Sequence, residues 1–169
     1  MNPAMNEELN LLIAALREEL AQYGEMLALL DREQELVVAR GSAELLQTVD
    51  AIHHQGEVIR RARSDREERQ RQVAALAELP ATATIEELKT RLPANHAILV
   101  GALVDENNEL LIRVRQRARQ NHLLLNRSLE LMQRLIGTLF PSGRTATYSG
   151  DGQLHGNALP QRAIYEAVG

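Results

Sequence analysis

His53 and His54 are the residues whose type and spacing come nearest to a metal site in this chain. Asp50 lies three residues before His53, so one helical stretch would offer carboxylate and imidazole ligands together. A di-metal helical bundle needs such a carboxylate and histidine pair from each of two helices. His96 and His122, further along the chain, lack this spacing, because Pro93 and Arg119 stand three places before them. We therefore expect an exposed, solvated histidine pair, with no metal and no cofactor.

Catalytic chemistry has equally little to build on. The chain has no Cys, which removes thiol nucleophiles, disulfides and cysteine-based metal sites. No GxSxG, P-loop or GxGxxG sequence occurs, so the usual motifs of serine nucleophiles and nucleotide binding are missing. We expect a binding protein and not an enzyme.

Arginine supplies almost all of the positive charge, and it gathers in residues 60–71 and 113–134. Neither stretch holds an aromatic side chain that could stack on a base, and the formal net charge of the chain is -4, so we expect no nucleic-acid binding. The segment from Met5 to Arg40 has eight acids against three arginines, whereas residues 113–134 have six arginines against one acid. Pairing between helices of one bundle is the simplest interpretation.

Membrane insertion and secretion find no support in the residues. The longest uncharged apolar run, Ala97 to Val104, is far shorter than the roughly 18 residues of a membrane span. The first twenty residues carry four glutamates and one arginine, the opposite of a cationic secretory signal. We expect a soluble cytoplasmic protein.

Long helices must position whatever this protein binds. With one Phe, three Tyr and no Trp among abundant Leu and Ala, the composition excludes an all-β fold. Between Leu9 and Val37 the apolar residues repeat every seven positions, which predicts a coiled-coil-like helix from Met5 to Arg40 that stops at Gly41. The two rows of this helix are Ile13, Leu20, Leu27 and Leu9, Leu16, Tyr23, Leu30, Val37.

Three further helices follow. The second begins after Ser42, and because its residues 60–72 are almost wholly polar, we expect its middle to be exposed or to separate from the first helix. Thr84 with Glu87 forms a capping box for a short helix, and the longest helix runs from His96 to Phe140. The predicted fold is all-α: an elongated antiparallel bundle of three long helices with coiled-coil-like seams and one short connecting helix. Residues 1–140 would form the bundle and residues 141–169 a flexible C-terminal tail.

Two asparagines interrupt an apolar row of the longest helix. Asn107 and Asn121 lie fourteen residues apart, which is two heptads. A buried asparagine lowers stability but fixes the alignment of a seam, because a slipped alignment leaves its amide unpaired. We expect these residues to set the helix register.

The C-terminal part of the longest helix is apolar over too wide an arc for one two-helix seam. Such a face suits either the docking of a foreign helix or burial in a homo-oligomer, and both alternatives stay open. The apolar residues are Leu123, Leu124, Leu125, Leu129, Leu131, Met132, Leu135, Ile136, Leu139 and Phe140. Beyond them, Tyr148 and Tyr165 stand in segments with no core to join, which favours a recognition role for the tail.

Two local sequences are more specific than the helical pattern. The sequence NHLLLNRSL occupies residues 121–129, late in the longest helix, and TYSGDG occupies residues 147–152, at the opening of the tail. The long first helix ends near Gly41 with Glu44, Leu45 and Leu46 just after it, and a polar middle follows. In this order and separation, the four features resemble the bacterial flagellar export chaperones of the FlgN type.

The resemblance implies a cytoplasmic chaperone that holds hook-filament junction proteins and delivers them to the flagellar type III export gate, with the export ATPase complex as a further candidate partner. It assigns contact with the C-terminal helical segment of the cargo to Leu125, Leu129, Met132, Ile136 and Leu139. Docking to the export gate falls on Tyr148. The alternative is a structural coiled-coil adaptor or dimerisation protein with no export role, which would have an inert tail and an apolar face consumed by self-association.

Overall fold

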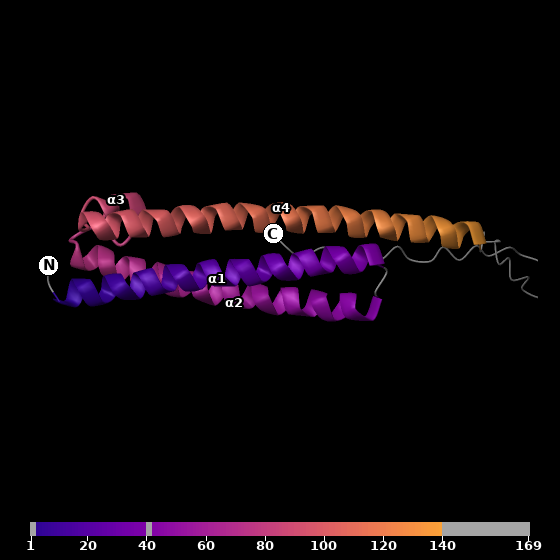
Figure 1. Ribbon diagram of the computed structural model, residues 1–169, viewed down its shortest axis with the longest axis horizontal. Helices are drawn as coiled ribbons and strands as arrows, with labels where there is room; N and C mark the ends of the chain where they lie inside the picture. Colours follow the sequence, from indigo (N-terminus) through magenta and orange to yellow (C-terminus); the bar gives the residue numbers. More distant parts are fainter. Residues whose placement is uncertain (1–2, 40–41, 140–169) are drawn as a thin grey trace, which may run out of the picture. The chain divides into compact units, whose positions relative to one another are not determined.

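The computed structural model describes residues 3–39 and 42–139, and within these ranges the chain forms four helices and no strand. The helices are α1 (Pro3–Ala39), α2 (Ser42–Leu76), α3 (Ile85–Lys89) and α4 (Ala94–Leu139) (Figure 1). The all-α prediction of three long helices and one short connecting helix is confirmed. The chain divides into two compact units, Met1–Asn126 and Arg127–Gly169, with the boundary inside α4. The predicted tail, residues 141–169, lies outside the described residues.

The helix ends follow local chemistry. Pro3 opens α1 at a position where its missing N–H costs nothing. Thr84 caps α3 as predicted, since its hydroxyl accepts from the Glu87 backbone N–H while the Glu87 carboxylate accepts from the Thr84 backbone. That carboxylate has a pKa below its usual range, because it accepts hydrogen bonds from the Thr84 backbone and hydroxyl.

α2 ends at Leu76 in a Schellman motif. The Leu79 N–H donates to the Ala74 carbonyl at 2.9 Å, and the Glu78 N–H donates to the Ala75 carbonyl at 3.1 Å. Glu78 has a φ of 56°, the left-handed conformation that glycine normally supplies at this position. α2 therefore ends at Leu76, three residues before Leu79, the last apolar residue of the pattern.

α1 and α2 run antiparallel, because their contacts pair rising numbers on α1 with falling numbers on α2. Arg69 is 3.7 Å from Glu8, Gln55 donates to Gln22, and Arg32 pairs with Glu44 at 2.7 Å. Figure 1 shows the two helices side by side along their length. The middle of α2, residues 60–72, is mostly exposed, as one of the two predicted alternatives has it. Its predicted separation from α1 is wrong, because Arg66 and Arg69 pair with Glu19 and Glu8 of α1.

α1 and α4 run parallel within the first unit, as an up-down-up arrangement of three helices requires. The Asn107 side-chain amide donates to the Leu16 carbonyl at 3.0 Å, and the Asn121 amide donates to the Leu30 carbonyl at 2.6 Å. Both pairs are offset by 91 residues, which is thirteen heptads. Both asparagines are buried on the seam where the sequence placed them.

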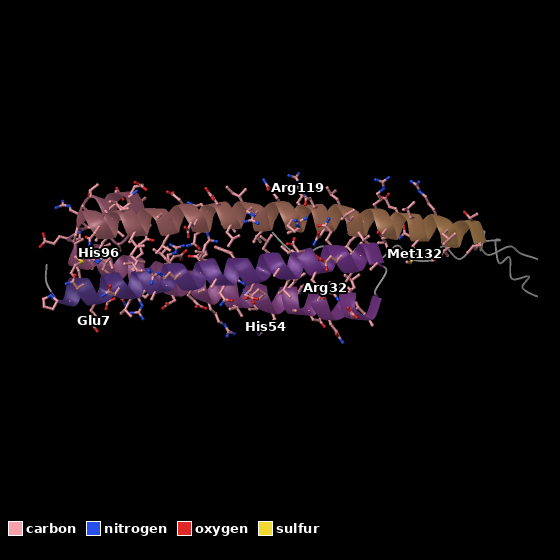
Figure 2. The ribbon with its side chains drawn as sticks, in the orientation of Figure 1. Glu7, Arg32, His54, His96, Arg119 and Met132 are labelled. Carbon is pink, nitrogen blue, oxygen red and sulfur yellow. The ribbon has the colours of Figure 1, made fainter. Side chains whose placement is uncertain are left out.

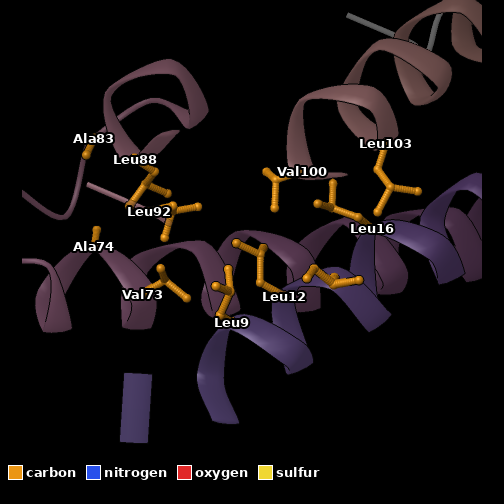
Figure 3. Close-up of a cluster of buried hydrophobic side chains, with 11 residues drawn as sticks. Leu9, Leu12, Leu16, Val73, Ala74, Ala83, Leu88, Leu92, Val100 and Leu103 are labelled. Atoms are coloured by element: carbon orange, nitrogen blue, oxygen red, sulfur yellow. The ribbon is translucent and has the colours of Figure 1, made fainter. Parts of the chain in front are cut away.

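An aliphatic core closes the end of the first unit where α1 begins, α2 ends and α3 connects to α4. Leu9, Leu12, Val73, Leu88 and Val100 have no exposed surface. Figure 3 shows their side chains converging from all four helices. The complete cluster is Leu9, Leu12, Ile13, Leu16, Val73, Ala74, Ala83, Leu88, Leu92, Val100 and Leu103.

Candidate docking surface

Six large apolar side chains at the C-terminal end of α4 are exposed to solvent. Their exposed fractions lie between 53% and 64%, and Met132 is labelled in Figure 2. We call them the docking face: Leu129, Leu131, Met132, Leu135, Ile136 and Leu139. A contiguous exposed apolar surface marks an interaction site more often than chance.

The docking face is wide. Because an α-helix turns by about 100° per residue, its six side chains span an arc of about 160°. That arc exceeds the narrow stripe of a two-stranded seam. It can bury one partner helix deeply or contact more than one.

The contact residues predicted from the sequence fall into three groups. Leu129, Met132, Ile136 and Leu139 belong to the docking face, whereas Leu125 is half-buried and belongs to the first unit. Tyr148 lies outside the described residues. Leu131 and Leu135 were not assigned a contact, yet they are as exposed as the others and complete the arc. Leu135 stands three residues after Met132 and four before Leu139, and Leu131 stands four before Leu135, which was the available signal.

A buried polar cluster in the first unit was not expected. Glu19 is 4% exposed, and its carboxylate accepts from Arg66 Nε at 3.0 Å and from the Tyr23 hydroxyl at 2.8 Å. Burial, followed by the hydrogen bond to Glu19, raises the pKa of Tyr23 to about 12. The phenol therefore stays protonated and donates a hydrogen bond to the carboxylate at physiological pH.

These side chains line a pocket of about 170 Å³ together with Ile85 of α3 and Asn107 of α4. The Asn107 Oδ1 atom is buried and accepts no hydrogen bond within the described residues. A pocket of this size with a polar lining accommodates ordered water, which satisfies such atoms. Glu19 and Arg66 already neutralise each other, so this pair offers a ligand in the pocket no unpaired charge.

His53 and His54 are both exposed on α2, and Figure 2 labels His54. Over residues 3–39 and 42–139, no three His, Cys, Asp or Glu side chains come together as metal ligands. The structure therefore offers no ligand set around the histidine pair. That the protein needs neither a metal nor a cofactor stays a prediction.

Among the described residues of the first unit, one arginine of the basic part of α4 pairs with the acidic α1. Arg117 Nε is 2.7 Å from Asp31 Oδ1, and its Nη1 donates to Gln34. Arg113, Arg115 and Arg119 are exposed and make no ion pair in the described part of the chain, and Figure 2 shows Arg119 on the side of α4 away from α1 and α2. Complementary helix faces thus explain only part of the charge pattern.

No helix in the described ranges is long and apolar enough to cross a membrane. Long helices with an exposed apolar face are typical of helical binding proteins. The family model described as FlgN protein matches residues 5–156, and the chain belongs to this family of flagellar export chaperones. The resemblance inferred from the sequence is confirmed. No curated protein and no solved structure matches the chain.

Proposed function

We propose that this protein is a cytoplasmic chaperone of flagellar hook-filament junction proteins. It binds their C-terminal helical segments on the docking face, prevents their premature association and delivers them to the type III export gate. The exposure of six large apolar side chains on one helical segment of a flagellar export chaperone supports this proposal most directly.

The chemistry required is binding without catalysis. An aliphatic face holds an amphipathic helix with a strength that grows with the apolar area removed from water. It makes few directional bonds, so release is not slowed by the rupture of a polar network. The junction protein would be covered during transit and handed over without a covalent step.

Delivery is assigned to residues beyond α4. Tyr148, in the sequence TYSGDG, is proposed to dock the loaded chaperone to the export gate, with the export ATPase complex as a second candidate contact. A tyrosine ring offers a large contact area at a small entropic cost, which suits a single anchoring residue.

The test measures binding of the C-terminal segment of a junction protein by calorimetry. Leu129→Glu and Met132→Glu should each weaken binding by about a hundredfold, because a buried unpaired carboxylate costs several kcal/mol. Ile112→Glu is the matched control, since Ile112 is an equally exposed apolar residue of α4 at 53%. It should bind as the unmodified chain does.

Two results would reject the proposal. One is unchanged affinity in both docking-face variants with helicity intact. The other is a homo-oligomer that dissociates when Leu129 is replaced by Glu, because the face would then be consumed by self-association. That second result is the expectation for the coiled-coil adaptor.

A further inference from the structure

The docking face has two chemically different edges. Arg127 and Arg134, seven residues apart, are both exposed along one edge. Leu131 lies four residues after Arg127 and three before Arg134, so both arginines flank this apolar side chain on the helix surface. The opposite edge, next to Leu129, carries the neutral amide Gln133. We call Arg127 and Arg134 the basic edge.

The basic edge is not neutralised by its own helix. Glu130 stands three residues after Arg127 and four before Arg134, spacings at which an intrahelical ion pair can form. Neither pair is present among the described residues, although a pair with a spacing of three residues, Arg71 with Glu68, forms on α2 at 2.7 Å. Residues 127–139 hold two arginines against this one glutamate, so the segment keeps an excess positive charge.

A second copy of the same face is a poor occupant. When two identical helices pack antiparallel, each edge lies against the same edge of its partner. Arg127 of one copy would then lie near Arg134 of the other, and like charges that face each other across a seam destabilise it. The charge pattern thus works against antiparallel self-association of this face and favours a partner of opposite charge.

We propose that the docking face selects an amphipathic helix that carries two carboxylates one heptad apart along the edge that meets Arg127 and Arg134. This inference rests on the proposed function and adds to it the chemistry of the partner. The apolar arc supplies most of the binding, and the basic edge fixes which way the partner helix is turned. Arg127 and Arg134 are therefore specificity determinants.

The experiment uses the full chain and two synthetic amphipathic peptides with the same apolar stripe. One has Glu at two flanking positions seven residues apart, and the other has Lys at both positions. Because exposed ion pairs are individually weak, the two together should give the Glu peptide about a tenfold advantage in affinity at low salt, shrinking as salt is added.

Charge reversal then tests which residues are responsible. The variant Arg127→Glu with Arg134→Glu should prefer the Lys peptide. The variant Arg115→Glu with Arg119→Glu is the matched control, because it alters the net charge equally at exposed, unpaired arginines elsewhere on α4. It should keep the preference for the Glu peptide.

The outcomes separate this inference from the proposed function. Equal affinity of both peptides for the unmodified chain, with binding still lost in Leu129→Glu, overturns the charge selection and leaves helix docking in place. Absence of binding by either peptide overturns the charge selection, and the proposed function is then decided by the junction-protein segment alone. Self-association through the docking face, detected by sedimentation and abolished by Leu129→Glu, also overturns the selection of an acidic partner.

Discussion

Asn107 on α4 donates its side-chain amide to the backbone carbonyl of Leu16 on α1 at 3.0 Å. The same amide also donates to the Leu103 carbonyl at 2.9 Å. The Oδ1 atom of Asn107 is buried and has no hydrogen-bond partner in the described residues. Asn121 repeats the contact with Leu30, two heptads along, and also donates to Glu33 at 2.7 Å. Two polar contacts at one offset define a single parallel alignment of α1 and α4.

Replacing both asparagines by leucine should separate stability from alignment. Asn107→Leu with Asn121→Leu removes two buried oxygens and adds apolar packing, but it also takes the Asn121 donor from the buried Glu33 carboxylate, so the two effects oppose each other and the free energy of unfolding should change little. The alignment should become ambiguous, because a heptad row of apolar residues also fits its partner one repeat away.

Spin labels can detect that ambiguity. Ala14 and Ala102 are exposed on α1 and α4, and the chain has no native Cys to label by accident. The unmodified protein should give one narrow distance between labels at these positions. The double leucine variant should add a second, resolved distance, because a slip of one heptad displaces α4 by about 10 Å along α1. A single unchanged distance would show that the asparagines do not set the register.

The ion pair between Arg66 and Glu19 gives a second prediction. Arg66→Met should lower the free energy of unfolding by about 3 kcal/mol, because it leaves a buried carboxylate without its guanidinium. Glu19→Gln combined with Arg66→Met should be less destabilised than Arg66→Met alone, since the charge is then gone. Urea unfolding measures both differences.

Arg61→Met is the matched control on the same helix, because Arg61 is exposed and makes no ion pair within the described ranges. Its effect should stay within about 0.5 kcal/mol. Equal effects of the Arg61 and Arg66 substitutions would mean that the buried pair contributes nothing specific.

The same ion pair shows where sequence reasoning stops. Heptad counting placed Leu9, Leu16 and Asn107 correctly, because side chains seven residues apart share a face whatever the fold. It assigned the α2 middle to solvent, since charge usually means exposure. Arg66 is instead only 17% exposed, because a carboxylate on another helix lies opposite it. Which residues meet across two helices depends on how each helix is rotated about its own axis. A single sequence does not give that rotation.

The burial of two acidic residues on α1 could also have been predicted from the sequence. Leu12, Glu19, Met26 and Glu33 form a third heptad row on α1, and all four are buried. Two glutamates in a row with apolar members indicate polar pairing inside a bundle, as Asn107 does on α4. The exposed apolar residues of the docking face could be predicted from the sequence. Their positions cover a wider arc of the helix surface than one neighbouring helix can bury.

The end of α2 gives a third prediction. Glu78 occupies the left-handed position of the Schellman motif at a φ of 56°, where a Cβ atom is strained. Glu78→Gly should raise the free energy of unfolding by about 1 kcal/mol, although the more flexible unfolded chain offsets part of the gain. Glu78→Ala keeps the Cβ atom and should change little. A thermal unfolding series in which the glycine variant gains nothing over the alanine variant would contradict the assignment.

The last prediction concerns Tyr148, because it distinguishes an export chaperone from an inert helical adaptor. The residue stands in TYSGDG, outside the described part of the chain, and in the proposed function it anchors the loaded chaperone to the export gate. Tyr148→Ala should leave helicity, oligomeric state and junction-protein binding unchanged, since the docking face does not include it. Capture of the loaded chaperone by the gate should fall about thirtyfold, the loss of roughly 2 kcal/mol that removal of an anchoring tyrosine causes.

Tyr165→Ala is the matched control, because it removes an identical ring from the same C-terminal stretch. Since the gate must distinguish loaded from empty chaperone, the comparison is made with the junction protein bound, and the difference between the two variants should shrink without it. Equal gate affinities for both variants in the loaded state would remove Tyr148 from the delivery step and favour the adaptor.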